Sequence, residues 1–523
     1  MTERTDLHAG LREASHHMKP EAPSLDAAIQ PLRPASAPPP RSGPAPGEGS
    51  RSPEPLPWKG ASRWSVFALL AGDVASLWLA RELVLALRVS LFGPHGMVPA
   101  FPEASLLWLT MRLFYGLYPG YGVSQPEELR RSAITTVLAA LSHSSLLVAL
   151  KDAEGSRFIA LGVWVLLIPI AWLLRDVIKH LLLRWNLYGR PVVVLGAGKS
   201  GRHTIREILD TPALGIVPVA AFDDDPAKLG TSVEGVPVIG TLRDAASWRA
   251  SYPVGDAIIA MPSAGAPRVV SIAHGLSHRY RNVGVIADLV GVGTLWTRTK
   301  NIGTCSMLEM PNQRFERSNL LWKRAFDLVV AVPLLVITGP VIALCALLVK
   351  VLSPGAPVFF SQSREGAGGR RVRMWKIRTM LPDADRALDE YLDANTGARE
   401  HWDRHMKLKD DPRILPWLGV FLRRSSLDEF PQLWNVLKGD MSLVGPRPFP
   451  DYHLERFPRE FRELRRQVPP GITGYWQVIH RSASSIEQQQ ASDTYYIYNW
   501  SLWLDLWIIF RTVGAVLSGK GAY

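Results

Sequence analysis

Cysteine is almost absent from this sequence, which has only Cys305 and Cys345 in 523 residues. A disulfide framework needs several cysteines, and a cysteine-based zinc site needs closely spaced pairs, so both are excluded. This scarcity fits a protein that works on the reducing, cytoplasmic face of a membrane.

Acidic residues are also few relative to basic ones: 47 Asp and Glu against 59 Lys and Arg give a formal net charge of +12. A basic excess suits phosphorylated substrates, anionic lipid or nucleic acid. Hydrophobic residues make up 47% of the chain, with 18 tryptophans. Because long apolar runs occur, we expect membrane lipid and phosphate partners and no nucleic acid.

The first 57 residues lack apolar periodicity and are rich in proline, alanine, serine and glycine. This composition predicts a disordered tail over 1–57. Met1 leads into polar sequence, so no cleavable signal peptide is expected there.

Four apolar segments follow, at 64–90, 101–122, 132–150 and 158–183. Each is close to the ~20 residues with which a helix crosses ~30 Å of hydrocarbon. They predict a four-helix transmembrane bundle over 58–186, with buried helices of a soluble protein as the alternative. Basic residues before the first segment, between the second and third, and after the fourth, such as Arg175 and Lys179, place both ends of the bundle in the cytoplasm.

A glycine-rich motif, RPVVVLGAGKSG, comes after the bundle. Its β-branched run feeds Gly196, Gly198 and Gly201, and Asp223 ends the next apolar run. This context predicts a Rossmann-like βαβ unit within an α/β domain over 187–300. The glycines would let a pyrophosphate approach a helix N-terminus, and the acid would accept a ribose hydroxyl. A dimerisation or regulatory module without a ligand is the alternative.

A fifth apolar segment covers 328–349 and has basic residues on both sides, among them Lys323 and Lys350. Positive charge at both ends indicates a segment that enters and leaves the membrane by the same face. A kinked transmembrane helix is the alternative, and it would send the rest of the chain to the outer face.

Two prolines interrupt this segment, Pro333 and Pro340, and Pro340 follows Gly339. A central Gly-Pro removes a backbone bond and permits a bend. We therefore predict a linker over 301–318 and then a re-entrant helix over 319–352, broken at Gly339-Pro340 into two arms too short to cross. Thr338 is the expected partner for the freed backbone groups.

The stretch RRSSLDEFPQL places two acids, Asp428 and Glu429, side by side. They are interpreted either as part of a capping box from Ser426 to Glu429 or as catalytic groups. A helix capped at Ser426 would contain Pro431 in its interior, where proline removes a backbone hydrogen bond. The loss is smaller if the helix begins nearer Asp428, because Pro431 then lies in or beside the first turn.

The second arrangement favours chemistry at the two acids. Arg423 and Arg424 precede them in sequence, and positive charge keeps carboxylates ionised. An ionised Asp428 can attack phosphorus, and Glu429 can bind Mg²⁺ together with substrate phosphates.

Two other classes of protein are alternatives. A nucleotide-sugar oxidoreductase needs a Tyr-x-x-x-Lys pair after the glycine motif, but Tyr252 and Tyr280 are followed four residues later by Asp256 and Gly284. A membrane scaffold that senses nucleotides and regulates polysaccharide assembly is the remaining alternative.

Several long blocks resemble the bacterial polyprenyl-phosphate sugar-1-phosphate transferases: KRAFDLVVA, TGPVIAL, APVFFSQ, KIRTM, RRSSLDEFPQLWNVLKGDMSLVGPRP, PGITGYWQV and NWSLWLDL, with YPGYG at 118–122. The layout resembles their long form, the undecaprenyl-phosphate galactose phosphotransferase family of monotopic phosphoglycosyltransferases, over nearly everything after residue 60. The resemblance implies a multi-domain membrane protein with four transmembrane helices, a Rossmann-like domain, a re-entrant membrane helix and a mostly helical α/β cytoplasmic catalytic domain over 353–523. It also implies a bacterial cytoplasmic (inner) membrane location.

The resemblance implies a two-step reaction. Asp428 matches the family nucleophile, which takes the phospho-sugar from a UDP-sugar, releases UMP and passes the phospho-sugar to undecaprenyl phosphate. Glu429 matches the partner acid associated with Mg²⁺. The product would start a surface polysaccharide such as O-antigen, capsule or exopolysaccharide, with galactose as the expected sugar and glucose as the alternative.

The same resemblance implies substrate contacts. Arg447, which follows Pro446 in GPRP, matches an arginine that binds the nucleotide, and Lys376 and Arg378 in KIRTM match basic residues near the diphosphate. Arg424 is the further candidate beside the acids. Family members commonly have serine where Gly339 precedes the breaking proline.

The carboxyl-terminal NWSLWLDLWIIFRTVGAVL carries Asp505 and Arg511 among aromatic and aliphatic residues. This pattern predicts an amphipathic helix lying in the membrane interface rather than a further span. Pairing of the glycine-motif domains predicts a homodimer.

Overall fold

The computed structural model describes residues 55–56, 63–93, 102–149, 157–248, 252, 254–287, 295–302, 305–309, 317–382, 384–395, 399, 411, 413–479 and 485–517. The predicted tail over 1–57 lies outside the described residues except for Pro55 and Leu56.

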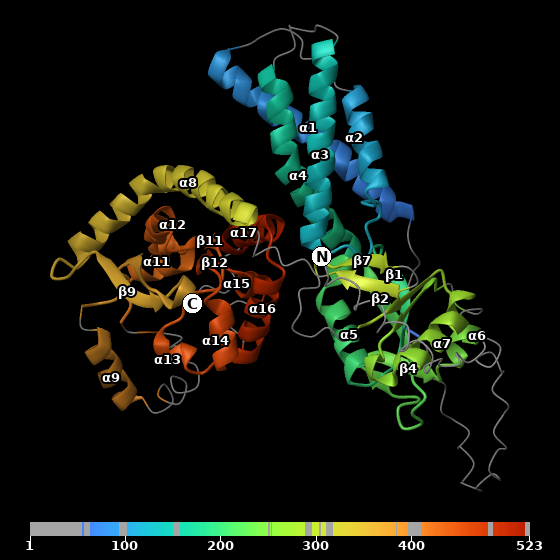
Figure 1. The fold of residues 1–523 in the computed structure, drawn as a ribbon. Helices are drawn as coiled ribbons and strands as arrows, with labels where there is room; N and C mark the ends of the chain where they lie inside the picture. The colour runs from blue at the N-terminus through green and yellow to red at the C-terminus, as the bar shows by residue number, and fades with distance from the viewer. Residues whose placement is uncertain are drawn as a thin grey trace, which may run out of the picture. The chain divides into compact units, whose positions relative to one another are not determined.

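Four helices occupy the region predicted to form the bundle: α1 (Arg63–Phe92), α2 (Pro102–Phe114), α3 (Gln125–Ala149) and α4 (Arg157–Arg184) (Figure 1). The second predicted segment was too long, because α2 ends at Phe114 and its 13 residues reach only ~20 Å at helical rise. Among the described residues, two helices are long and apolar enough to cross a membrane: α4 over Ile159–Arg184, and α8 (Arg317–Leu352) over Ser318–Leu352. These helices support membrane association, and the four-span bundle stays a prediction.

Charged side chains pair inside the bundle. Arg112 donates to Asp73 at 2.9 Å, while Arg175 and Lys179 contact Glu128 at 2.5 and 2.6 Å. Arg175 and Lys179, which the sequence suggested as flanking charges, are therefore buried partners of an acid. Their use as markers of membrane orientation is correspondingly weaker.

The α/β domain alternates strands and helices: β1 (Arg190–Leu195), α5 (Lys199–Asp210), η2 (Pro212–Leu214), β2 (Ile216–Phe222), β3 (Ser232–Val233), β4 (Val236–Gly240), α6 (Asp244–Trp248), β5 (Asp256–Ile259), η3 (Pro262–Ala264), α7 (Ala266–Ser277) and β6 (Asn282–Val285). The sheet order is β3-β4-β2-β1-β5-β6, and every pair is parallel except β3 with β4. The order reverses beside β1, so the carboxyl end of β1 lies where such sheets bind ligands. The buried run from Val192 to Leu195 is the β-branched segment that predicted this strand.

A β-hairpin follows, formed by β7 (Arg298–Ile302) and β8 (Cys305–Glu309). The predicted domain boundary at residue 300 therefore falls inside β7. The predicted linker over 301–318 contains a strand, because a local antiparallel pairing satisfies the backbone there.

The predicted break in α8 was wrong: the helix runs for 36 residues with Pro333 and Pro340 inside it. Figure 1 shows it as one curved helix. Each proline removes only one intrahelical bond, and the surrounding bonds preserve the helix. The Thr338 hydroxyl donates to the carbonyl of Leu334 at 2.7 Å, a bond that bends helices without ending them. It does not reach the carbonyl that Pro340 leaves free, and a side chain at Gly339 would meet open space.

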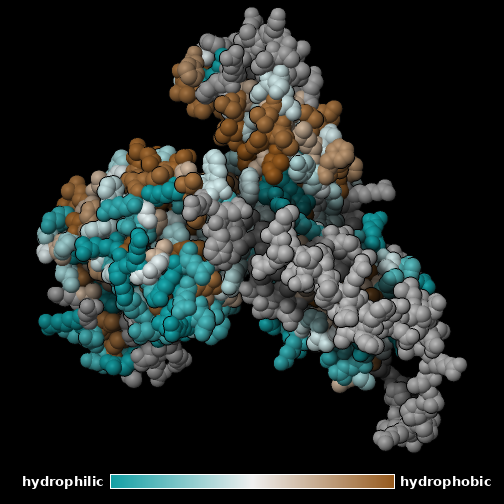
Figure 2. Space-filling view, in the orientation of Figure 1, coloured by the Kyte–Doolittle hydropathy of each residue, from teal (hydrophilic) through white to brown (hydrophobic). Residues whose placement is uncertain are grey.

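The two faces of α8 differ. Ala331, Cys345 and Val349 on one face are buried against the catalytic domain. The opposite face exposes Leu320, Leu321, Trp322, Val329, Val332, Val336, Ile337, Val341, Leu344, Leu347 and Val351. Figure 2 shows hydrophobic residues gathered over α8 and over the helices of the bundle. An apolar surface of this extent indicates contact with lipid or protein rather than with water.

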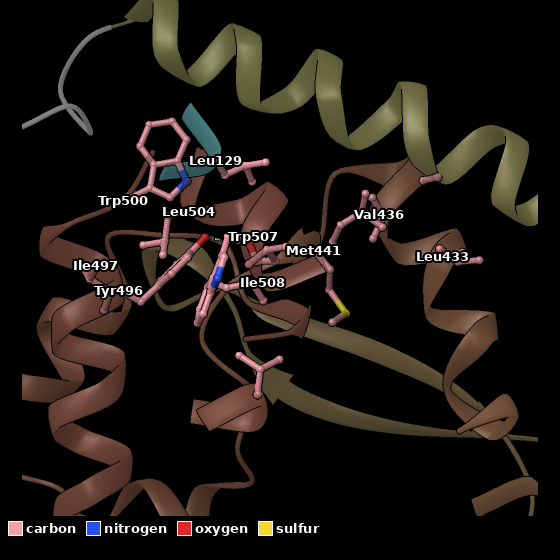
Figure 3. Packing of buried hydrophobic residues seen from close by; sticks show 14 of the residues in the cluster. Leu129, Leu433, Val436, Met441, Tyr496, Ile497, Trp500, Leu504, Trp507 and Ile508 are labelled. Atoms are coloured by element: carbon pink, nitrogen blue, oxygen red, sulfur yellow. Dashed lines mark hydrogen bonds between the residues drawn. The ribbon is translucent and has the colours of Figure 1, made fainter. Parts of the chain in front are cut away.

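The catalytic domain is built from short elements: β9 (Phe359–Glu365), η5 (Ala367–Gly369), β10 (Arg371–Ile377), α9 (Ala384–Ala394), α11 (Leu418–Ser425), η6 (Leu427–Gln432), α12 (Leu433–Lys438), β11 (Ser442–Val444), α13 (Asp451–Leu454), α14 (Arg459–Arg465), β12 (Gly471–Thr473), α15 (Tyr475–Ile479), α16 (Ile486–Tyr498) and α17 (Leu502–Leu517). Its core lies beneath α8, where Val436, Met441, Tyr496, Leu504 and Trp507 converge (Figure 3). This core holds together the strands and turns that carry the predicted site.

The carboxyl-terminal helix, α17, forms where it was predicted, but Asp505, which was expected on its polar face, lies inside the protein. Asp505 on α17 is fully buried, where it accepts bonds from Lys323 at 2.7 Å and Tyr496 at 2.8 Å. The buried acid is tolerated because a cation and a hydroxyl satisfy it. Lys323, expected as a flanking charge of the membrane segment, is thus an internal ion-pair partner.

Candidate active site

Four predicted site residues come together from three segments of the catalytic domain. Lys376 lies near the end of β10, Asp428 and Glu429 lie in η6, and Arg447 follows β11. Lys376 and Arg447 both contact Glu429. The structure therefore brings two adjacent acids and two cations into one site.

A buried asparagine holds two of these segments together. Asn435 on α12 accepts a bond from the backbone N–H of Trp375 at 3.3 Å and donates to the carbonyl of Arg373 at 2.8 Å. Both partners lie on β10, next to Lys376. Asn435 thus fixes the strand against the turn that carries the acids, a role that the sequence did not suggest.

The local backbone explains why the two acids lie in a short turn. Ser426 ends α11 in the left-handed region, with φ of 57°, and a 3-10 helix follows over Leu427–Gln432. The capping box is not formed: Ser426 makes no side-chain cap bond, and Glu429 N donates instead to its carbonyl at 3.2 Å. Pro431 lies within this 3-10 helix, and the α-helix begins only at Leu433. The structure therefore matches neither predicted helix start, because the two acids lie in a 3-10 helix ahead of the α-helix.

Glu429 is held in its charged form. Its Oε1 accepts bonds from Lys376 Nζ at 2.6 Å and from Arg447 Nη2 at 3.0 Å. Burial favours the neutral acid, but Arg447 and Lys376 together outweigh it and lower the pKa of Glu429 to about 2. Glu429 is therefore a permanent anion near neutral pH.

Asp428 has the opposite environment. Its side chain is buried, with 8% of the residue exposed, and no hydrogen bond to it occurs among the described residues. Burial raises its pKa to about 6, with Glu429 adding to the effect and Lys376 and Arg423 opposing it. Neighbouring acids whose pKa values are driven apart are suited to different chemical roles.

Arg423, rather than Arg424, is the arginine of this pair that influences Asp428. Arg423 is partly buried on α11, and its Nε donates to Thr379 Oγ1 at 3.0 Å. Arg424 is exposed and lines a shallow surface hollow with Trp417 and Phe421. Both arginines were candidates because both directly precede the acids in sequence. The structure distinguishes them, because it partly buries Arg423 and exposes Arg424.

Arg378 and Pro446 have structural partners. The guanidinium of Arg378 is buried and donates to the hydroxyl and carbonyl of Ser353 at 3.1 and 2.9 Å, so it anchors the segment after α8. Pro446 is buried beside Arg447, and its carbonyl accepts from Gly471 N at 3.0 Å. Substrate contact by either residue stays a prediction.

The two acids also fit the predicted Mg²⁺. Both bonds to Glu429 end on Oε1, and among the described residues none reaches Oε2. The described part of the chain has no cluster of three or more metal-binding side chains. Because Mg²⁺ is usually held by one or two carboxylates together with substrate phosphates and water, Glu429 Oε2 and Asp428 suit it.

In the α/β domain, the three motif glycines differ in what they need. A Cβ at Gly201 would lie 1.8 Å from the carbonyl oxygen of Gly196, and a Cβ at Gly196 would meet Met261 at 2.3 Å. Gly198, at the N-cap of α5, faces open space. Two of the glycines are thus required by packing, and only Gly198 leaves room for a ligand.

Asp223 is already bonded within its own domain. Its carboxylate accepts from the N–H groups of Ala197 at 2.6 Å and Asp225 at 2.9 Å, and from Lys228 at 3.2 Å. Partial burial raises the pKa of this acid, but these three donors outweigh it and lower the pKa. A ribose would have to compete with them, so nucleotide binding at Asp223 stays a prediction.

Two protein families and several individual proteins are similar to this chain. The profile of the family described as Bacterial sugar transferase matches residues 318–519, and that of the family described as CoA-binding domain matches 114–287. The UDP-galactose-lipid carrier transferase of Erwinia amylovora is 33% identical over 80% of this chain and 86% of its own length. The undecaprenyl-phosphate galactose phosphotransferase of Salmonella typhimurium is 32% identical over 76% and 82%. The UDP-glucose:undecaprenyl-phosphate glucose-1-phosphate transferase of Escherichia coli is 32% identical over 64% and 69%.

Proposed function

Because the chain belongs to the bacterial sugar transferase family, we propose that it transfers a hexose 1-phosphate from a UDP-sugar to undecaprenyl phosphate and releases UMP. The product would start a surface polysaccharide. We favour galactose, which the names of the relatives from Erwinia amylovora and Salmonella typhimurium contain, and glucose is the alternative suggested by the Escherichia coli relative.

One observation carries the mechanism: Asp428 is buried, has no hydrogen-bond partner among the described residues, and lies next to an acid whose charge is neutralised. With a pKa of about 6, Asp428 is mostly ionised at neutral pH. Burial limits the solvation of its oxygens, and no donor among the described residues binds them, so they can attack phosphorus. Glu429, in contrast, binds both cations through its Oε1.

The reaction proceeds in two displacements. An oxygen of Asp428 attacks the sugar-linked phosphorus, the bond from that phosphorus to the bridging oxygen breaks, and UMP leaves with the bridging oxygen and its electron pair. A phosphate oxygen of undecaprenyl phosphate then attacks the same phosphorus. Asp428 leaves as a carboxylate, and a diphosphate-linked sugar lipid forms.

The charged residues around Asp428 hold and orient the diphosphate. Lys376 and Arg447 both contact Glu429 and supply positive charge where the leaving phosphate gains negative charge. Glu429 Oε2 and Asp428 would hold Mg²⁺, which when bound neutralises phosphate charge. Arg423 favours the ionised form of Asp428.

We further propose that α8 enters and leaves the membrane on the cytoplasmic side. Near its start, Arg324 donates to the carbonyls of Val436 and Leu437, at 2.5 and 2.7 Å. Near its end, Cys345 and Val349 pack in the same cluster as residues of α11. Both halves of α8 therefore contact the same domain. If α8 crossed the bilayer, one of its halves would have to leave that domain. The exposed apolar face supports immersion in one leaflet.

The test is a panel of UDP-sugars offered to the purified full chain with undecaprenyl phosphate and Mg²⁺. We expect UMP release and a lipid-linked sugar with UDP-galactose. A preference for UDP-glucose would select the alternative sugar. UMP release that yields no lipid-linked product, or no release with any UDP-sugar, would contradict the proposed reaction.

A further inference from the structure

The segment that carries Arg447 has few ways to hold its own backbone. It reads GPRPFP, and proline has no N–H to donate. Gly445 N donates to the carbonyl of Thr473 at 2.9 Å, and Gly471 N donates to that of Pro446 at 3.0 Å. Both bonds lie before Arg447, and the next main-chain bonds, from His453 N and Leu454 N to the carbonyl of Pro450 at 3.0 Å, lie after it. Among the described residues, the hydrogen bond to the main chain of Arg447 comes from a side chain.

That contact comes from Arg465, the last residue of α14. Its guanidinium donates to the main-chain carbonyl of Arg447 and, through its other terminal nitrogen, to Asp493 on α16. Its charged centre also lies 4.6 Å from the ring centroid of Phe449, two residues beyond Arg447. Arg465 thus contacts the GPRPFP segment at two points, the carbonyl of Arg447 and the ring of Phe449.

Asp493 holds Arg465 in turn. Asp493 is 1% exposed and Arg465 is 8% exposed, so both charges have been removed from water. A buried ion pair is often no more stabilising than well-packed apolar side chains. Its orientation therefore calls for an explanation other than stability, and one end of it points at the backbone of an active-site arginine.

We propose that Arg465, fixed by Asp493, is a positioning residue that sets Arg447 against Glu429. The path runs from Asp493 through Arg465 to the carbonyl of Arg447, and from the side chain of Arg447 to Glu429 at 3.0 Å. Arg465 acts through Arg447 and contacts neither Asp428 nor Glu429. This inference rests on the proposed transferase function.

The experiment is a double-mutant cycle on the full-length protein, with UMP release as the readout. Arg465→Gln should lower kcat by about 10- to 100-fold, as expected for loss of a residue that orients a catalytic group. In the Arg447→Ala background the same change should have almost no further effect, because Arg447 is no longer there to be positioned. Arg459→Gln, an exposed arginine paired with Glu463 on the same helix, is the matched control and should leave kcat unchanged.

Asp493→Asn provides a second route, because it is nearly isosteric and removes the charge that holds Arg465. A threefold to tenfold fall in kcat, again absent in the Arg447→Ala background, is expected. If either change lowers activity by the same factor in both backgrounds, or leaves the otherwise normal enzyme fully active, the positioning role is overturned. Failure of the unmodified protein to turn over any UDP-sugar would instead overturn the proposed function, and this inference with it.

Discussion

Asp223 and Asp428 are both acids of recognisable motifs, but the protein treats them in opposite ways. Asp223, in the α/β domain, accepts bonds from two backbone N–H groups and a lysine, and its pKa is lowered. Asp428, in the catalytic domain, is buried without a hydrogen bond among the described residues, and burial raises its pKa to about 6.

The difference separates an acid that maintains a fold from an acid held for chemistry. When both oxygens of a carboxylate already accept hydrogen bonds, a ligand must replace those bonds and gains little free energy by binding. A buried carboxylate without a partner is costly, and such groups concentrate at functional sites. The unsatisfied acid is therefore the better functional candidate, although the glycine motif around Asp223 is the more familiar signature.

Exchanging each acid for its amide should give the largest contrast. Asp428→Asn should reduce turnover by a factor on the order of 10⁴ or more, because an amide cannot act as the nucleophile. Asp223→Asn should leave turnover within about twofold and lower the unfolding temperature, since it weakens bonds internal to its domain. Both are measured by UMP release and thermal unfolding in detergent. Normal turnover by Asp428→Asn would reverse the assignment.

The pH dependence should sharpen the contrast. Because the reactive form of Asp428 is ionised, kcat/KM should fall as pH decreases through about 6. Lys376 opposes the burial effect on Asp428, so Lys376→Met should move this acid limb to higher pH. Arg424→Met, at an exposed position, should leave it in place.

The sign of the stability effect distinguishes this loss of activity from unfolding. The pKa of folded Asp428 lies above its ordinary value, so protonation favours the folded state as pH falls from about 6 towards that value. An acid limb that does not respond to Lys376→Met would contradict the electrostatic coupling.

The smallest expected effect concerns the glycines beside Asp223. Gly201→Ala should destabilise the α/β domain by about 1–3 kcal/mol, because its Cβ would meet the carbonyl of Gly196. Gly198→Ala should change stability by less than about 0.5 kcal/mol, since nothing lies within 4 Å of the added atom. Thermal unfolding of the two variants measures this. Equal destabilisation would show that Gly198 also serves packing.

Local patterns predicted much of the architecture. The β-branched run before the glycine motif became β1, and the apolar segments became α1 to α4. The poor fit of Pro431 to an α-helix begun at Ser426 was also predicted, and the structure has a 3-10 helix there instead. In each case neighbouring residues determine the backbone, so the sequence carries the information.

Contacts between distant segments could not be predicted in this way. Lys323 and Asp505 are 182 positions apart, and each was interpreted from its neighbours as a surface charge. Arg378 follows the same pattern, because its partner Ser353 lies on the other side of the β9–β10 hairpin in sequence. In α8, the intact bonds around Pro340 preserved a helix that the local Gly-Pro signal predicted to break.

The central claim is that Asp428 carries the phospho-sugar during the reaction. The direct measurement is mass spectrometry of the protein after incubation with UDP-galactose and Mg²⁺ in the absence of lipid acceptor, followed by peptide mapping. We expect one hexose phosphate on the peptide containing Asp428, its absence in Asp428→Asn, and its discharge when undecaprenyl phosphate is added. Formation of the lipid product in a single turnover without any adduct, or an adduct on another residue, would contradict the account.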